Sequence, residues 1–102
     1  MTEHAGLSPG DIVRSRRGKD EGQLVVVIAL EGERAALVAD GDNRRFDRPK
    51  RKNVLHLEPT GLRSGEVADS LRDTGRVTNG KLKFAIADAR RRLEAHAEEK
   101  GD

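Results

Sequence analysis

Residues 9–30 read PGDIVRSRRGKDEGQLVVVIAL, and the fold of the chain depends on them. Residues 11–16 predict a short strand, and the loop after it reverses the chain because Gly18 and Gly22 adopt positive φ at no steric cost. The β-branched run at residues 24–28 has no polar alternation, so both of its faces should be covered. We therefore expect a strand, a basic glycine loop and the central strand of a small barrel.

Three more short strands are expected downstream. Residues 35–39 predict the third, and the turn-forming run DGDN before Arg44 predicts a tight hairpin that leads to a fourth at residues 44–46. Pro49 should end that pairing because it lacks a backbone donor. Residues 54–58 alternate as a fifth strand. Five short strands predict a mostly β fold, with a five-stranded SH3-like barrel at residues 9–60 after a flexible N-terminus at residues 1–8.

The composition changes after residue 60, and residues 61–102 predict a helical extension. Ser64 is a suitable N-cap for a short helix that Gly75 ends, and Thr78 caps a second helix. An apolar stripe at helical spacing runs along the second helix and must dock on the barrel, on the first helix or on another chain. The stripe consists of Leu82, Ala85, Ile86, Ala89 and Leu93.

Phe46 and Phe84 make up the whole aromatic content. We expect Phe46 in the core rather than as a platform for base stacking, because a core this small needs a large residue. Phe84 lies nearly opposite Ile86 on the second helix. It either packs against the short helix, which we favour, or is exposed as a contact for a partner.

The charge distribution is more informative than the net charge of +2. Residues 14–19 carry four positive charges and residues 44–52 a net five, so the rest of the chain is left at −7. Such a basic patch on an otherwise acidic protein is typical of a phosphate-backbone binder. The candidate RNA-binding residues are Arg14, Arg16, Arg17, Lys19, Arg44, Arg45, Arg48, Lys50, Arg51, Lys52 and, as a hydrogen-bonding group, His56.

The first basic run and the strand after it resemble the KOW motif of several ribosomal proteins and of bacterial transcription elongation factors of the NusG type. The likeness is closest to short bacterial KOW-domain RNA-binding proteins, which are similar to KOW-type large-subunit ribosomal proteins of archaea and eukaryotes. It extends to residues 38–42, 48–52 and 56–57. It implies an SH3-like barrel, ribosomal RNA as ligand and a role at the ribosome or in translation. The motif residues are Gly10, Asp11, Val13, Gly18, Lys19, Asp20, Gly22 and the valines that follow; Ser15 and Glu21 depart from the usual pattern.

Catalysis is not expected. The three histidines are far apart, there are no cysteines, and no serine sits in a nucleophile-elbow context. We expect no enzyme activity, no cofactor, no metal and no small-molecule substrate. The absence of a long apolar run and of an export signal in residues 1–5 predicts a cytoplasmic protein without a membrane partner.

Two other functions are weighed against RNA binding. A KOW-type adaptor in transcription or translation would use an exposed Phe84 and could contact ribosomal proteins. Binding of double-stranded DNA by the second helix is disfavoured, because residues 78–99 carry mixed charge. The three arginines at residues 90–92 spread around that helix, so we expect them to be exposed to solvent rather than to face one ligand.

Overall fold

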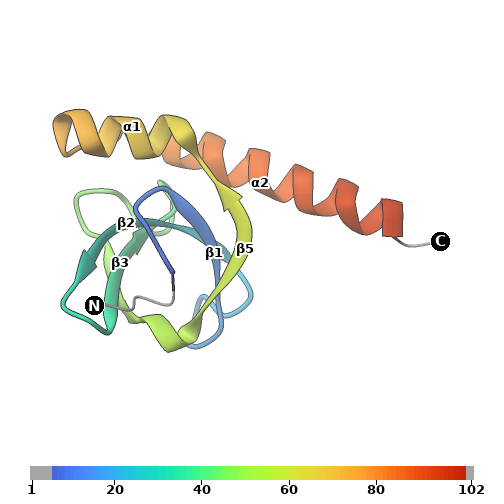
Figure 1. The fold of residues 1–102 in the computed structure, drawn as a ribbon, viewed down its shortest axis with the longest axis horizontal. Helices are drawn as coiled ribbons and strands as arrows, with labels where there is room; N and C mark the ends of the chain where they lie inside the picture. Colours follow the sequence, from blue (N-terminus) through green and yellow to red (C-terminus); the bar gives the residue numbers. More distant parts are fainter. Residues whose placement is uncertain (1–5, 101–102) are drawn as a thin grey trace.

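A computed structural model describes residues 6–100 of the chain, with side chains for residues 6–97. It contains five strands, one short 3₁₀ helix and two α-helices, and both α-helices lie on the same side of the curved sheet (Figure 1). The elements, in chain order, are β1 (Asp11–Ser15), β2 (Leu24–Glu31), β3 (Ala35–Ala39), β4 (Lys50–Asn53), η1 (Val54–His56), β5 (Leu57–Arg63), α1 (Gly65–Thr74) and α2 (Asn79–Lys100).

The five strands form one antiparallel sheet in the order β4-β3-β2-β1-β5. β2 is therefore the central strand, as its apolar run predicted. Register shifts lie between Asp11 and Val13 on β1 and between Val27 and Ala29 on β2. Such irregularities bend a sheet. Among the described residues, each ladder joins neighbours in this order, without a ladder between β4 and β5.

β2 buries both of its faces, and this divides the core into two clusters. Leu24, Val26 and Ile28 face the helices, whereas Val25 and Val27 face the inside of the curved sheet, because successive side chains of a strand point to opposite faces. The helix-facing cluster also holds residues of α1 and α2. The inner cluster is completed by Leu7, Val13, Ala36, Val38, Val54 and Leu57.

Both helices begin and pack largely as predicted. The Ser64 hydroxyl accepts a hydrogen bond from Val67 N, and Gly75 ends α1 in the left-handed conformation. The Thr78 hydroxyl accepts from Lys81 N at the start of α2. The apolar stripe of α2 packs against β1, β2 and α1, which decides where it docks. Its members Leu82, Ala85, Ile86 and Ala89 are buried, and Leu93 packs against them.

The start of α2 also contacts the turn after β3. Gly41 has φ +84°, and a Cβ at this position would clash with the backbone carbonyl of Asn79 and lie 3.0 Å from the Cβ of Leu82. A glycine is therefore required both by the backbone conformation and by the close approach of the helix.

The predicted fourth strand at residues 44–46 was wrong. These residues form a turn, in which Arg48 N donates to Arg45 O and Phe46 N donates to the side chain of Asn79 at 2.7 Å. The strand that pairs with β3 is instead β4, which begins directly after Pro49. Proline is tolerated at that point because it lies outside the ladder.

The predicted fifth strand at residues 54–58 was also wrong over most of its length. Asn53 accepts a hydrogen bond from Leu55 N and caps η1, so His56 lies in a 3₁₀ turn rather than on an alternating strand. β5 then runs to Arg63, past residue 60, where we placed the end of the barrel. Pro59 fits within β5 because β5 is an edge strand.

The two aromatic residues differ in burial. Phe46 packs, partly buried, against the helix-facing cluster as predicted, whereas Phe84 is 62% exposed, so the favoured expectation that it packs was wrong. Residues 1–5 of the predicted flexible N-terminus lie outside the described residues, and Leu7 is buried in the inner cluster. Neither α-helix in the described part of the chain is long and apolar enough to cross a membrane.

Candidate nucleic-acid interface

A partly buried ion pair shapes the glycine loop between β1 and β2. Lys52 Nζ lies 2.8 Å from Asp20 Oδ1 and donates a second hydrogen bond to Arg17 O at 2.7 Å. Ser15 Oγ, on the buried end of β1, lies 3.1 Å from Asp20 Oδ1 and from Arg17 O. The Lys52 side chain is only 8% exposed. This cluster ties the first basic run, on the loop, to the second basic run, on β4.

Hydrogen bonding decides the ionisation of Asp20. Burial alone would raise the pKa of this carboxyl, but hydrogen bonds from Lys52 and Ser15, together with the Lys52 charge, more than offset that effect. The pKa of Asp20 is therefore held below its ordinary value. The carboxylate stays charged at neutral pH and binds the ammonium group beneath the loop.

The loop itself is closed by backbone hydrogen bonds. Gly22 N donates to Ser15 O at 2.7 Å, and Gln23 N donates to Asp20 O at 3.0 Å. Gly18 has φ +92°, and a Cβ there would lie 3.0 Å from Lys52 Nζ. The tight path of the loop over Lys52 leaves the Lys19 side chain exposed.

The two basic runs meet at a cavity of about 540 Å³ beside this loop. Lys19 comes from the first run, and Arg44 and Lys50 come from the second. We call this cavity the basic hollow. It is also lined by the acidic residues Asp20 and Asp40, by the polar residues Gln23 and Asn43 and by the apolar residues Val25 and Val38.

The other predicted RNA-binding residues take several positions. Arg14 donates to Gly22 O at 3.0 Å beside a neighbouring cavity, and Arg17 Nη1 lies 3.5 Å from His56 Nε2. Arg45 and Arg48 are exposed.

Three of the predicted RNA-binding cations form ion pairs within the protein. Arg16 pairs with Glu58 at 3.1 Å, Arg51 pairs with Glu31 at 2.7 Å, and Lys52 pairs with Asp20.

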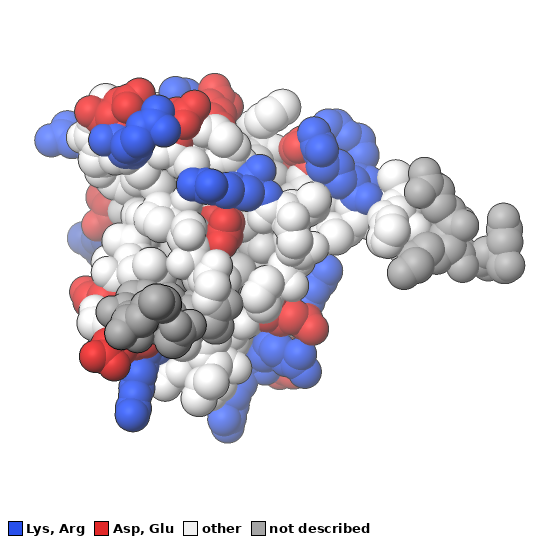
Figure 2. Space-filling view, viewed as in Figure 1, with Lys and Arg blue, Asp and Glu red and all other residues white. Residues whose placement is uncertain are grey.

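Charges of the two signs alternate over α1, at the top of the view in Figure 2. Arg72, for example, pairs with Asp69 and Asp73, and these two carboxylates raise its pKa. This helix therefore does not present a field of one sign.

Sequence reasoning missed two kinds of residue around the cavities. Gln23 and Asn43 carry no signal that separates them from other turn residues. Arg90 was placed with its neighbours on a solvated helix, yet it follows Ile86 by four residues, and this spacing puts it beside the apolar stripe. It lines two cavities between α2 and the sheet.

No protein-family model matches the chain. It is 44% identical over 62 residues to a Bacillus subtilis (strain 168) protein named "Putative ribosome-binding protein YbzG". The aligned region covers 61% of this chain and 84% of that protein. This chain therefore belongs to the same family as the Bacillus subtilis protein YbzG.

Proposed function

We propose that this protein is a non-enzymatic RNA-binding protein of the cytoplasm that binds ribosomal RNA and acts at the ribosome or in translation. The observation that carries the proposal is the basic hollow, because its three cations come from two runs that are 25 residues or more apart in sequence yet line one cavity. The ribosome-binding role in the name of the YbzG relative supports the ribosome as partner.

The scaffold in this proposal is a KOW-type, SH3-like barrel. Its support is the inner cluster, to which β1, β2, β3, η1 and β5 all contribute a buried side chain. The two register shifts give the bends that a five-stranded sheet needs to wrap around such a cluster.

The chemistry is recognition of the phosphate backbone. Arg44 offers a planar fork for two phosphate oxygens, and Lys19 and Lys50 supply compact charges nearby. Aromatic stacking, on which much single-strand recognition depends, is largely unavailable with two phenylalanines in the chain. We therefore expect recognition of RNA shape with modest sequence selectivity and strong salt dependence.

The test is sedimentation of a native lysate through a sucrose gradient, with the protein followed across the free, subunit and whole-ribosome fractions at low and raised salt. The variant Lys19→Gln/Arg44→Gln/Lys50→Gln removes the three cations of the basic hollow. Its matched control, Arg72→Gln/Arg76→Gln/Arg91→Gln, removes three exposed cations of the helical half of the chain.

We expect the unchanged protein and the control to migrate with ribosomal fractions and the hollow variant to move to the free fractions. Circular dichroism checks that each variant is folded. Migration of the unchanged protein in the free fractions alone, at both salt concentrations, would contradict the ribosomal role. Equal retention of both variants in the ribosomal fractions would contradict the assignment of the site.

The exposed Phe84 favours a second function, that of a protein-interaction adaptor in transcription or translation, with ribosomal proteins among its partners. A side chain of this size that is 62% exposed is a common anchor in protein interfaces. Phe84→Ala separates the two functions. Loss of ribosome association with unchanged affinity for purified ribosomal RNA supports the adaptor, and unchanged association supports direct RNA binding.

A further inference from the structure

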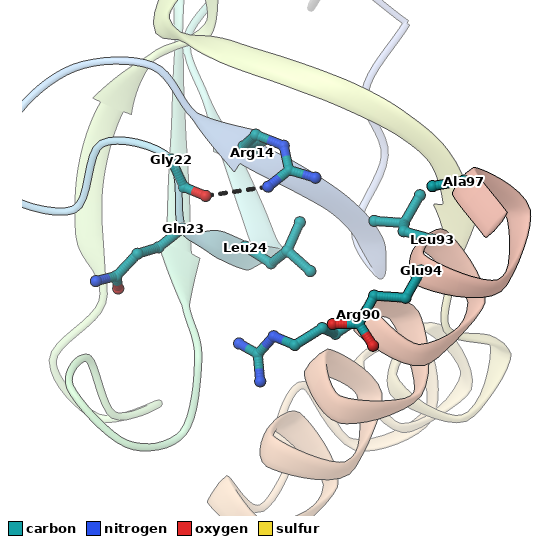
Figure 3. Close-up of a pocket in the computed structure, with 8 residues that line it drawn as sticks. All are labelled: Arg14, Gly22, Gln23, Leu24, Arg90, Leu93, Glu94 and Ala97. Carbon is teal, nitrogen blue, oxygen red and sulfur yellow. Dashed lines mark hydrogen bonds between the residues drawn. The ribbon is translucent and has the colours of Figure 1, made fainter. Parts of the chain in front are cut away.

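The three consecutive arginines of α2 do not share one environment. Asp88 pairs with Arg91 at 2.6 Å and with Arg92 at 2.9 Å. Arg90 makes no ion pair with the described residues, and its guanidinium lies on the side of α2 that faces the start of β2 (Figure 3). Arg90 is therefore available to a ligand, whereas its two neighbours are held by the helix.

Arg90 lines two cavities between α2 and the sheet. One, of about 420 Å³, also contains Arg14, which is held by its hydrogen bond to Gly22 O (Figure 3). The other, of about 220 Å³, contains Lys83. The two share Gln23, Leu24 and Arg90.

These cavities continue into the basic hollow. The smaller cavity shares Gln23, Asp40 and Asn43 with the hollow, so Gln23 lines all three. The three cavities thus form a row that leads from the glycine loop, past Gln23, to the middle of α2. We call this row the extended groove.

The charges along the extended groove favour an anion. Its carboxylates are Asp20, Asp40, Asp42 and Glu94, and two of them are engaged: Asp20 binds Lys52, and Asp40 accepts hydrogen bonds from the backbone N–H groups of residues 42 and 44. Only Asp20 has a counter-charge of its own, Lys52; against the charges of the other three carboxylates stand six cations, Arg14, Lys19, Arg44, Lys50, Lys83 and Arg90. A groove lined by cations from several elements suits a nucleic-acid backbone that runs along it.

We infer that the RNA site continues onto α2. Lys83 and Arg90 bind phosphates that follow those held in the basic hollow, and Gln23 hydrogen-bonds the nucleotide between them. Gln23 is exposed, and its side-chain amide offers both donors and an acceptor, which suits a base edge or a ribose 2′-hydroxyl. This inference rests on the proposed RNA binding and extends its site to a helix whose three consecutive arginines we expected to face solvent.

The test is binding to purified large-subunit ribosomal RNA over a range of salt concentrations. The variant is Lys83→Gln/Arg90→Gln. Its matched control, Arg91→Gln/Arg92→Gln, removes the same charge from the same helix at residues paired with Asp88. We expect the variant to bind roughly tenfold more weakly and to lose about one to two units of the slope of log affinity against log salt, whereas the control changes affinity by less than about twofold.

The outcomes separate this inference from the proposed function. If Lys83→Gln/Arg90→Gln behaves like its control while Lys19→Gln/Arg44→Gln/Lys50→Gln loses binding, the extension onto α2 is wrong and RNA binding by the basic hollow stands. If none of the three variants changes binding, the assignment of the site to the basic hollow fails as well, and if the unchanged protein does not bind the RNA, the proposed function fails. Circular dichroism and thermal unfolding check that the variants keep the fold.

Gln23→Ala tests the middle of the extended groove, because it changes no charge. We expect it to weaken RNA binding by roughly threefold to tenfold with an unchanged salt slope. We also expect it to reduce the preference for RNA over DNA of the same sequence if the amide contacts the 2′-hydroxyl. Unchanged affinity for RNA would overturn the contact assigned to Gln23.

Discussion

Lys50 and Lys52 show how two residues of one basic run take different roles. They are two positions apart on β4 and so lie on the same face of the strand. The loop that contains Asp20 covers Lys52, whereas Lys50 remains exposed at the basic hollow. Charge counting in the sequence treats the two lysines as equal. Only the pairing of β4 with β3 and the path of the loop distinguish them.

The partly buried ion pair makes Lys52 a stability determinant. Lys52→Met would leave the Asp20 carboxylate partly buried without its counter-charge, and we expect a loss of about 1–3 kcal/mol in the free energy of unfolding. Lys50→Met on the same strand is the matched control and should change stability by less than about 0.5 kcal/mol. Urea denaturation measures both. Equal stability of the two variants would show that the pair does not hold the loop.

The same pair predicts a pH dependence of stability. The pKa of Asp20 in the folded protein lies below its ordinary value of 3.8, so the unfolded chain binds more protons than the folded protein in the pH range between the two values. The Asp20 contribution is thus fully present above about pH 5 and is lost as the pH falls through the folded pKa. The unchanged protein should lose stability on acidification more steeply than Asp20→Asn. Parallel stability curves from pH 6 to pH 2 would contradict this linkage.

The close contact between the turn after β3 and the start of α2 should make Gly41 important for stability. Gly41→Ala places a methyl group against the Asn79 carbonyl in addition to the strain of positive φ, and we expect a loss of about 2–4 kcal/mol. Gly22→Ala is the control, because Gly22 has φ +87° and a Cβ added there would meet no other atom within 4 Å. It should cost about 1 kcal/mol, the conformational part alone. Thermal unfolding compares the two, and an equal loss would contradict the close packing.

Elements formed by residues close together in the sequence were predicted well, whereas elements that depend on distant residues were not. The bounds of β1, β3 and α1 agree closely with the structure, and β2 extends three residues beyond its apolar run, to Glu31. These four elements follow from local patterns, namely an apolar run, a glycine turn and the Ser64 cap. Residues 44–58 do not, because non-local partners decide them: Asn79 draws Phe46 into a turn, and β3 pairs with the basic residues of β4. Nothing in the apolar pattern of the sequence marks KRKN as a strand.

The same limit applies to the candidate site. The sequence located both basic runs, and the resemblance to the KOW motif placed Lys19, of the first run, on the glycine loop. It did not reveal that Arg16 and Arg51 pair with Glu58 and Glu31, which are 42 and 20 residues away. Nor did it single out Arg90, because the effect of Asp88 on the neighbouring arginines depends on side-chain geometry.

The two α-helices form part of the hydrophobic core of the molecule and are not a separate addition to the sheet. The helix-facing side of β2 is covered by buried residues of α1 and α2, among them Val67, Leu82 and Ile86. Deletion of residues 64–102 would expose Leu24, Val26 and Ile28 to water, and each fully buried side chain of this size contributes about 1.5–3 kcal/mol. That loss is comparable with the entire stability of a small domain.

We therefore expect the fragment 1–63 to lack a cooperative urea transition and to bind a hydrophobic dye. Deletion of residues 98–102 is the control; it leaves this cluster intact and should preserve the transition. A fragment 1–63 that unfolds cooperatively, with a stability close to that of the full chain, would mean that the sheet folds by itself. In that case residues 64–102 would be an appendage in the physical sense, and the division of the chain near residue 60 would describe two independent units.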